Sequence, residues 1–404
     1  MFPETQNLEF NQIIQASPAQ IFYAFTNATA LKEWLCDVAT LAPRLAGRIY
    51  LAWNSGFYTA GEFIEYEPDQ KLSFTWNGRN EPGPTQVEVT LTPQGNSTQV
   101  SLLHKGLGMD AAWANMVKET RQGWTESLEN LASVLEKGPD LRIVQRPMLG
   151  ITVGDFDKTQ ADHLGIPVSE GIRLDSVLDT MGAHAAGLRK DDVVIGVDGM
   201  AITDFASLAS ALNGRRGGDT VTVDFYRGPE KKTVLMELSK RPVPTTAASV
   251  AELAGMAQER FHKLQAQLDE VLEGVSEAEA EHNPAKGEWS VNDILAHLIH
   301  GERDGQKYVT EILGGQASWS DDYAGNLPTR TKATVSAFPT LKELRDELGR
   351  LYNESAALYE CLPAELPQQR KGTWWGFCYF MAEPPYHEFE HFEQIRLAIQ
   401  AARH

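Results

Sequence analysis

The chain has 404 residues, of which 42% are hydrophobic, 9% aromatic and 23% charged. At roughly 100–200 residues per domain, this length predicts two to four domains, each large enough to bury a core of its own. The composition excludes collagens, disordered tails and coiled-coil rods. The net charge of −19 disfavours a nucleic-acid-binding protein, because phosphate binding requires a basic surface.

The sequence carries no feature typical of a membrane or secreted protein. No apolar run approaches the ~18–20 residues that cross a bilayer, and the opening MFPETQNLEF does not resemble a secretory signal. The cysteines Cys36, Cys361 and Cys378 lie far apart and form no CxxC motif. We therefore expect a reduced, cytoplasmic protein with neither a membrane nor a nucleic acid as its partner.

Two stretches are typical of domain boundaries. A long helical pattern stops at Gly and Pro within residues 136–140, and residues 241–249 contain two prolines among small side chains. These two boundaries divide the chain into three predicted domains, over residues 1–138, 139–243 and 244–404. The last domain is the most acidic, with 14 basic and 25 acidic residues.

The first domain begins with a strand-like pattern over residues 8–15, followed by a helix that Ser17 caps and a proline opens. Residues 47–103 predict strands separated by turn residues, several of them with alternating apolar and polar side chains. A long helix follows over residues 113–135, with apolar side chains three or four positions apart. This spacing keeps one apolar stripe of the helix facing the sheet.

Motifs in this domain resemble the helix-grip domains of the SRPBCC (START-like) superfamily, in particular the homologues of the heat-shock-chaperone ATPase activator. They are PAQIFYAF at residues 18–25, LKEW at 31–34, GEFIEYEP at 61–68 with FTW at 74–76, and GWTESL at 123–128. The resemblance implies an α+β fold with an apolar pocket between the long helix and a curved sheet. The residues expected to line it are Trp34, Trp53, Trp76, Trp113 and Trp124. The alternative is that these tryptophans fill a closed core, since large aromatic side chains dominate core burial.

Trp113 and Trp124 lie 11 residues apart, close to three helical turns, so we expect both to face the same interior. No catalytic arrangement is visible in this domain. Its one histidine, His104, has no acid or base that the sequence can assign to it. The domain is therefore interpreted as a module that binds an apolar ligand.

The middle domain consists of short predicted strands joined by tight turns. Residues 193–197 predict a buried strand, Asp198-Gly199 a two-residue hairpin turn, and Asp204 the cap of a short helix. Two further strands are predicted over residues 220–226 and 232–238. The pattern favours a mainly β domain.

The turn AGLRKDD at residues 186–192 closely resembles the AGLxxGD turn of HtrA-type PDZ domains, with Asp191 where glycine is usual. Aspartate tolerates the left-handed conformation better than most residues. The resemblance implies that backbone N–H groups of Leu149, Gly150 and Ile151 hold the terminal carboxylate of a peptide or protein partner. The middle residue is expected to be glycine because the backbone approaches the ligand closely. The alternative is a PDZ fold that serves only as a rigid spacer, and no GDSGG-type protease motif occurs in the chain.

Helical periodicity dominates the last domain. The pattern predicts helices over residues 250–272, 290–313, 340–362 and 384–402, with a loop over residues 314–339. Ser290 and Thr340 are each followed three residues later by an acid, as in a capping box. Four helices of this length predict an all-α antiparallel four-helix bundle with one long crossover.

Histidines at helical spacing indicate the chemistry of this domain. His387 and His391 are four residues apart, so their imidazoles share one helix face, where both can reach one cation. His297 lies on an apolar stripe of an earlier helix, and His300 follows one turn later. Because a histidine on such a stripe is usually a hydrogen-bonded core residue, the spacing alone leaves a structural role open.

The motif EWSVNDILAHL at residues 288–298, followed by HxxxHxxQI from His387, resembles the DinB family of bacterial four-helix bundles. The resemblance places the family's three metal ligands on His297, His387 and His391. His300 is expected either to lie next to these ligands without binding the metal or to lie at the surface. Three neutral imidazoles leave coordination positions open to water or substrate, as in catalytic sites. The expected ion is a divalent transition metal, with Zn or Ni favoured by affinity.

The resemblance also implies a reaction, because DinB-like proteins of known activity are commonly metal-dependent transferases that act on low-molecular-weight thiols. Coordination to a cation deprotonates a thiol near neutral pH. Two functions compete: a binding protein whose bundle is a metal- and thiol-dependent transferase or isomerase, or a non-catalytic stress or chaperone-linked adaptor with a structural metal. The sequence identifies no catalytic acid or base, no substrate, no PDZ target and no oligomeric state.

Overall fold

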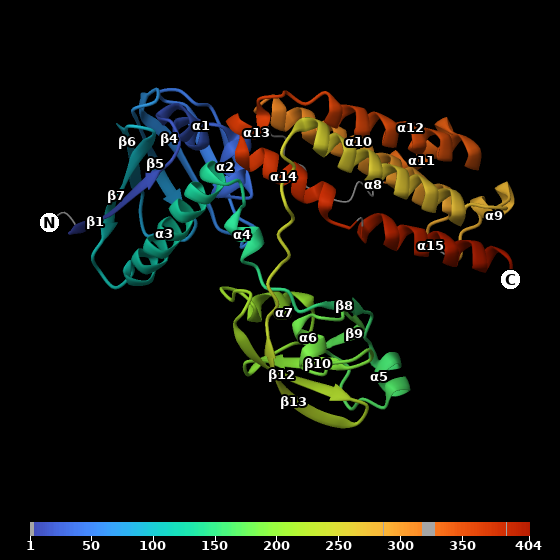
Figure 1. Ribbon diagram of the computed structural model, residues 1–404. Helices are drawn as coiled ribbons and strands as arrows, with labels where there is room; N and C mark the ends of the chain where they lie inside the picture. The colour runs from blue at the N-terminus through green and yellow to red at the C-terminus, as the bar shows by residue number, and fades with distance from the viewer. Residues whose placement is uncertain (1–3, 286, 317–327, 385) are drawn as a thin grey trace. The chain divides into compact units, whose positions relative to one another are not determined.

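The computed structural model describes residues 4–285, 287–316, 328–384 and 386–404. The chain folds into two units: one joins the part up to Asp140 with the part from Pro244 onward, and the other comprises Leu141–Val243 (Figure 1). The second unit therefore interrupts the first in sequence. No described helix is both long enough and apolar enough to cross a membrane.

The N-terminal part of the first unit is a seven-stranded antiparallel sheet with helices packed on it. Its strands are β1 (Thr5–Ile14), β2 (Val38–Leu41), β3 (Arg48–Ala52), β4 (Tyr58–Glu67), β5 (Lys71–Gly78), β6 (Thr85–Gln94) and β7 (Ser97–Gly108). They pair in the order β1-β7-β6-β5-β4-β3-β2. Every second residue of β6 from Thr85 to Leu91 is buried, because successive side chains of a strand point to opposite faces. The α+β helix-grip fold is confirmed.

Two short helices, α1 (Pro18–Thr26) and α2 (Ala28–Trp34), connect β1 to β2. Ser17 and Gln20 form a capping box at the start of α1. The sequence pattern does not predict α2, whose start depends on one side chain: Asn27 accepts hydrogen bonds from the N–H groups of Thr29 and Ala30. The same asparagine is the C-cap of α1, so it ends one helix and begins the next.

The long helix α3 (Ala114–Glu136) packs on the sheet through Trp124, Leu128 and Leu131. Trp113, the residue before the helix, lies instead in a separate cluster with Leu8 and Leu107. The expectation that Trp113 and Trp124 share one interior is therefore wrong. Helical spacing gives both side chains a similar direction, but 11 residues separate them by about 16 Å along the axis, so they reach different parts of the sheet.

The second unit is a mainly β domain, as expected. Its strands are β8 (Ile151–Gly154), β9 (Ile172–Val177), β10 (Val193–Val197), β11 (Met200–Ala201), β12 (Thr220–Arg227) and β13 (Glu230–Glu237). They follow the order β13-β12-β10-β9-β8, with β11 paired to β10. Its short helices are α4 (Leu141–Val144), α5 (Lys158–Leu164), α6 (Gly182–Ala185) and α7 (Phe205–Ala211).

Turn chemistry explains where these strands and helices begin. The φ angles of Asp198 and Gly199 are 48° and 79°, which suit the tight hairpin between β10 and β11. Asp204 caps α7, as predicted. Asp191 has a φ of 67°, so the aspartate that replaces glycine does adopt the left-handed conformation, and Arg173 Nη1 donates a 2.8 Å hydrogen bond to its carboxylate.

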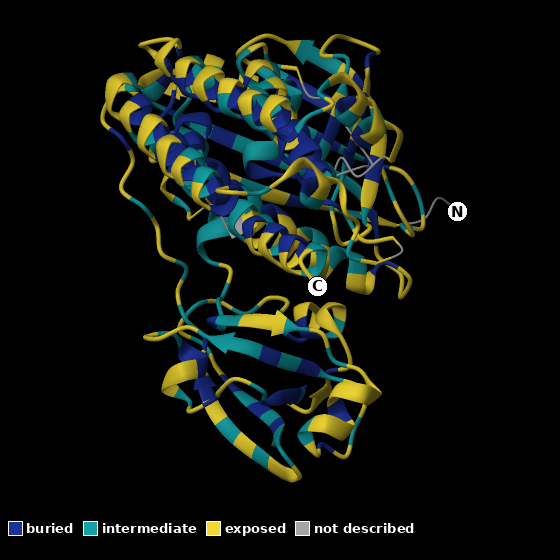
Figure 2. Cartoon of the chain, turned by 90° about the vertical axis from the view of Figure 1, so that its right-hand side faces the viewer, coloured by how far each residue is buried: buried dark blue, intermediate teal, exposed yellow. Residues whose placement is uncertain are grey.

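The C-terminal part of the first unit is a helical bundle. Its long helices are α8 (Val250–Val271), α10 (Val291–Leu313), α12 (Leu341–Glu360) and α15 (Tyr386–Ala402), and α12 and α15 each pack against both α8 and α10. These helices carry buried residues along one side and exposed residues along the other (Figure 2). The capping boxes at Ser290 and Thr340 are formed as predicted. The all-α fold of this region is confirmed.

The bundle contains more helices than the sequence pattern indicates. The loop predicted over residues 314–339 includes α11 (Pro328–Ala337), while residues 317–327 lie outside the described residues. The other short helices are α9 (Glu277–Glu281), α13 (Leu366–Gln369) and α14 (Lys371–Ala382). Helix α14 packs against both α8 and α3. Its side chains are accordingly apolar around most of its circumference.

Candidate functional site

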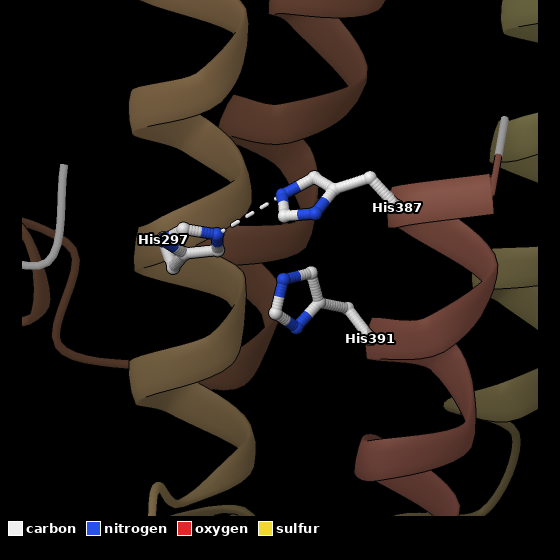
Figure 3. Close-up of side chains that lie close together, drawn as sticks. All are labelled: His297, His387 and His391. Atoms are coloured by element: carbon white, nitrogen blue, oxygen red, sulfur yellow. Dashed lines mark hydrogen bonds between the residues drawn. The ribbon is translucent and has the colours of Figure 1, made fainter. Parts of the chain in front are cut away.

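The three histidines expected to bind a metal lie together in the bundle. His297 is a buried residue of α10, and His387 and His391 occupy the first two turns of α15. One ring nitrogen of each histidine lies within 4.8 Å of the corresponding nitrogens of the other two. His297 Nε2 is 3.2 Å from His387 Nε2, and the three imidazoles point toward one another from two helices (Figure 3).

This geometry suits a tetrahedral transition-metal ion. Two nitrogens bound to one zinc at ~2.0–2.1 Å lie about 3.3 Å apart in tetrahedral geometry, close to the 3.2 Å between the Nε2 atoms of His297 and His387. His391 Nδ1 is 3.0 Å from Gln394 Oε1. If this oxygen accepts, Nδ1 carries the proton and Nε2 keeps a free lone pair for a metal. Burial lowers the pKa of His391, which favours the neutral, ligating form.

Trp289 forms one wall of the histidine cluster. Its ring centroid lies 5.1 Å from that of His297 and 6.3 Å from that of His391, to which it is stacked. The indole directly precedes Ser290, the N-cap residue of α10, so the capping box holds its backbone in place. An apolar wall of this kind limits the access of water to the imidazoles from that side.

Two other side chains that the sequence offers for chemistry in the bundle do not belong to the cluster. His300 faces α11 instead, where its Nε2 lies 3.3 Å from Thr334 Oγ1. Cys378 is buried in α14, and burial raises the pKa of its thiol to about 11. A thiol with that pKa is protonated at neutral pH, so Cys378 is not poised as a nucleophile.

The bundle also contains buried and half-buried polar residues that the sequence pattern does not reveal as a group. Each of the four long helices contributes at least one, and they are Arg260, Glu302, Tyr352, Ser355 and Glu388. The one visible signal is the arginine, which interrupts an apolar stripe of α8 between Ala257 and Leu264. The other members have no diagnostic spacing, because they come from separate helices.

In the second unit, the loop expected to hold a peptide carboxylate has backbone N–H groups without partners in the described part of the chain. Within the described residues, the N–H groups of Leu149 and Gly150 donate no hydrogen bond. Gly150 O accepts from Leu178 N–H at 2.8 Å, so the next residue, Ile151, turns its N–H toward the outer side of β8. β8 ends the strand order among the described strands, and that outer side is therefore a free edge.

The reason for glycine at position 150 differs from the expected one. Gly150 has a φ of 76°, and a Cβ there would lie 2.1 Å from Met181 Cβ. The close approach that requires glycine is thus to a side chain of the same domain. A ligand is not needed to explain it.

Three of the five predicted pocket tryptophans lie side by side in the N-terminal domain. The ring centroid of Trp76 is 6.3 Å from that of Trp53 and 5.7 Å from that of Trp124. Trp34 belongs to the same core but packs edge-on against Phe25, with centroids 4.9 Å apart. The remaining tryptophan, Trp113, lies in the separate cluster described above.

His104 is buried against these rings and forms a hydrogen bond with one of them, Trp124. Trp124 Nε1–H donates to His104 Nδ1 at 3.0 Å, so the ring proton must be on Nε2, which lies 2.7 Å from Thr85 Oγ1. Burial lowers the pKa of His104 to about 4. The histidine is therefore a neutral structural link between the sheet and α3.

Comparison with family models identifies three domains. The activator of Hsp90 ATPase homolog 1-like model matches residues 15–136, the PDZ model residues 147–238, and the DinB superfamily model residues 260–395. The chain thus contains these three domains in this order.

Similar proteins match only parts of the chain. The serine protease Do-like HtrA of Lactococcus lactis is 31% identical over 163 residues, which cover 39% of this chain and 35% of the relative. A probable periplasmic DegP-like serine endoprotease of Bartonella henselae is 28% identical over 27% of this chain and 21% of its own length. The chain therefore spans about a third or less of these curated relatives.

Solved structures similar to this chain include the Aha1 dimer of Colwellia psychrerythraea, with 21% identity and a TM-score of 0.29 over 32% of this chain and 96% of that one. An HSP90 activator of Plasmodium falciparum has 24% identity and a TM-score of 0.28, covering 32% of this chain and 95% of that one.

Proposed function

We propose that the chain is a multidomain binding protein whose bundle is a metal- and thiol-dependent transferase. The observation that carries the proposal is the group of three imidazoles, His297, His387 and His391, with ring nitrogens within 4.8 Å. They provide three neutral nitrogen ligands, so a tetrahedral ion would have one position left for a substrate. Zinc or nickel would suit this ligand set.

A divalent ion held by these imidazoles would stabilise a bound low-molecular-weight thiol as its thiolate. Other residues of the chain would orient the imidazoles and limit the access of water to them. Gln394 orients His391, and Trp289 covers one side of the imidazole group. The electrophile that accepts the thiol is proposed to be apolar, in keeping with an apolar-ligand module at the N-terminus of the chain.

The other two domains are proposed to bring partners to the bundle. The open edge of β8 and the N–H groups of Leu149, Gly150 and Ile151 suit a peptide with a free C-terminus. Leu149 and Ile151 also line a small apolar pocket with Leu208 and Met236. In the N-terminal domain, the aromatic group around Trp76 is the proposed place for an apolar ligand.

Metal analysis of the purified full-length chain tests the central proposal. We expect roughly one divalent transition metal per chain, and we expect His297→Ala and His391→Ala to lose most of it. Each substitution removes a direct ligand, which should exceed the ~10–100-fold effect of changing a residue that only orients a ligand. His300→Ala is the matched control, because it removes a buried imidazole of the same helix that faces Thr334.

Unchanged metal content in both ligand variants would disprove the three-histidine site. A thiol-conjugation assay on the metal-loaded protein separates the two functions that the sequence leaves open. Turnover that disappears in His391→Ala supports the transferase. Stoichiometric metal without turnover, over a range of thiols and apolar electrophiles, favours the adaptor with a structural metal.

A further inference from the structure

A polar cluster inside the bundle contains hydrogen-bonding groups that the described protein leaves unused. Arg260 is 8% exposed and Tyr352 is 2% exposed. The Arg260 Nε–H and the Tyr352 hydroxyl are both buried without a hydrogen-bond partner. Folding normally pairs such groups, because an unpaired buried donor loses its hydrogen bonds to water without replacement. Two unpaired donors in one cluster therefore point to a bound partner.

The same cluster contains two carboxyl groups. Glu388 Oε1 lies 3.6 Å from Arg260 Nη2, and Glu302 Oε2 accepts a 2.8 Å hydrogen bond from Ser355 Oγ. Tyr352 lies three residues before Ser355 on α12, so the two side chains share one helix face, and its ring stacks on Phe261, the residue after Arg260, with centroids 5.5 Å apart. The cluster thus combines one guanidinium, two carboxyls and a free hydroxyl from four helices.

These groups suit a ligand that carries both charges. A simple anion would be repelled by the carboxyls, and a simple cation by the guanidinium, whereas a zwitterion is complementary to both. We propose that the cluster binds the α-amino-acid end of the thiol substrate. The α-carboxylate would accept from Arg260 and Tyr352, and the α-ammonium would donate to Glu302 and Glu388.

The position of the cluster relative to the histidines supports this assignment, which rests on the proposed thiol transferase. Glu388 directly follows His387 in the first turn of α15 and lies three residues before His391, and it is the same carboxyl that lies 3.6 Å from Arg260. A small amino-acid thiol is short enough to place its two ends at such neighbouring sites. The substrate class is then a cysteine derivative with a free amino-acid head group.

Two further observations are in keeping with a site for a small molecule. Phe380, which is 50% exposed, lies over the Arg260 guanidinium at 4.8 Å, and Arg260 Nη1 donates to Glu383 O, which leaves Nε as the unpaired donor of the guanidinium. Burial raises the pKa of Glu302 to about 7, with the charge of Glu388 acting in the same direction. An ammonium group bound between these carboxyls would relieve that repulsion.

Binding measurements on the metal-free full-length chain test the head-group site without involving a thiol. The probe is S-methyl-L-cysteine, measured by calorimetry or saturation-transfer NMR. Its methyl ester lacks the carboxylate charge, and its N-acetyl derivative lacks the ammonium. We expect each blocked compound to bind at least about tenfold more weakly, the effect of losing one charge-assisted hydrogen bond. Equal binding of all three compounds, or no binding of any, would overturn the proposal.

Tyr352→Phe removes only the unpaired hydroxyl. We expect the ligand-free variant to melt at the same or a higher temperature, and its Kd for S-methyl-L-cysteine to rise about tenfold. Tyr58→Phe, at an exposed tyrosine of the N-terminal domain, is the control and should change neither quantity. A lower melting temperature with an unchanged Kd would show that the hydroxyl is structural and would overturn the assignment.

The thiol itself is tested separately, on the metal-loaded chain. L-cysteine should bind more tightly than S-methyl-L-cysteine if the sulfur reaches the metal. If the two bind equally while the blocked compounds still fail, the head-group site stands and the transferase proposal falls.

Discussion

At His104 the neighbouring residues determine both the tautomer and the charge. The indole N–H of Trp124 can only donate, so the imidazole nitrogen that faces it must accept. The other nitrogen then donates to Thr85, and burial keeps the ring neutral. The sequence shows this histidine as isolated, because its partners lie 19 and 20 positions away along the chain.

The low pKa of His104 predicts acid sensitivity of the N-terminal domain. With a pKa of about 4 in the folded state and about 6.5 unfolded, the unfolded chain binds more protons between these values. Folding free energy is therefore lost as the pH falls from about 6.5 to about 4, by up to roughly 3 kcal/mol. Urea unfolding at several pH values, compared with His104→Gln, measures the effect.

The variant should be less stable at neutral pH but should lose less stability on acidification. NMR gives an independent check, since the His104 ring resonances should not titrate above pH 5. Titration of this ring near 6.5 would contradict the assignment.

At the scale of elements, β8 and the loop before it form the proposed peptide-binding site. In this proposal the unused N–H groups of the loop bind the carboxylate, and the free edge of the strand pairs with the preceding residues of the peptide. Both depend on the path of the chain at Gly150, where Met181 leaves no room for a Cβ. The shape of this loop is therefore set by packing inside the domain.

We predict that the full-length chain binds peptides with a free hydrophobic C-terminus and that amidation of the terminus abolishes binding, because amidation removes the charge that the loop N–H groups receive. Gly150→Ala should weaken binding and destabilise the domain. Gly214→Ala is the matched control, since Gly214 has the same φ of 76° but open space around its Cβ position. Fluorescence anisotropy with labelled peptides provides the measurement.

The control should show only the cost of the left-handed backbone, about 1–2 kcal/mol, with peptide affinity retained. Equal affinity for free and amidated peptides would identify the domain as a spacer.

At the scale of the whole first unit, the N-terminal domain and the bundle share a polar contact. The Arg370 guanidinium donates to Ile312 O at 2.6 Å and lies 3.6 Å from Glu33 Oε1. Thr373 Oγ1 donates to the same Glu33 oxygen, and Lys371 Nζ donates to Glu136 O at 2.9 Å. Burial raises the pKa of Glu33, so its carboxylate depends on these partners.

Arg370→Met should destabilise this unit by about 2–3 kcal/mol, because it leaves the largely buried Glu33 carboxylate without its cation. The double variant Glu33→Gln with Arg370→Met should recover part of the loss, which is the signature of a coupled pair. Arg396→Met, at an exposed arginine paired with Glu393 on α15, is the control and should cost less than about 0.5 kcal/mol. Chemical denaturation followed by circular dichroism measures all three.

If Arg370→Met and Arg396→Met lower the free energy of unfolding by the same small amount, the contact between Arg370 and Glu33 contributes little to stability. The N-terminal domain and the bundle would then be held together mainly by the apolar packing of α14 against α3.

Features that depend on neighbours in the chain are predictable from the sequence. The capping boxes at Ser290 and Thr340, the turn at Asp198-Gly199 and the left-handed Asp191 all rest on contacts or backbone preferences within a few residues. The pairing of two histidines on α15 is local for the same reason, since residues four apart share a helix face. The fold class and the grouping of His297 with this pair could be predicted on this basis together with the family resemblance.

Only the tertiary structure decides which distant side chains meet. It places Trp113 apart from Trp124, buries α14 between two parts of the first unit, and brings Arg260, Glu302 and Tyr352 together from three helices. Helical periodicity predicts the direction in which each side chain points. It predicts neither how deeply the side chain is buried nor which residue of another helix it contacts. Those are decided by how the helices pack, where close contact and the pairing of buried polar groups select one arrangement.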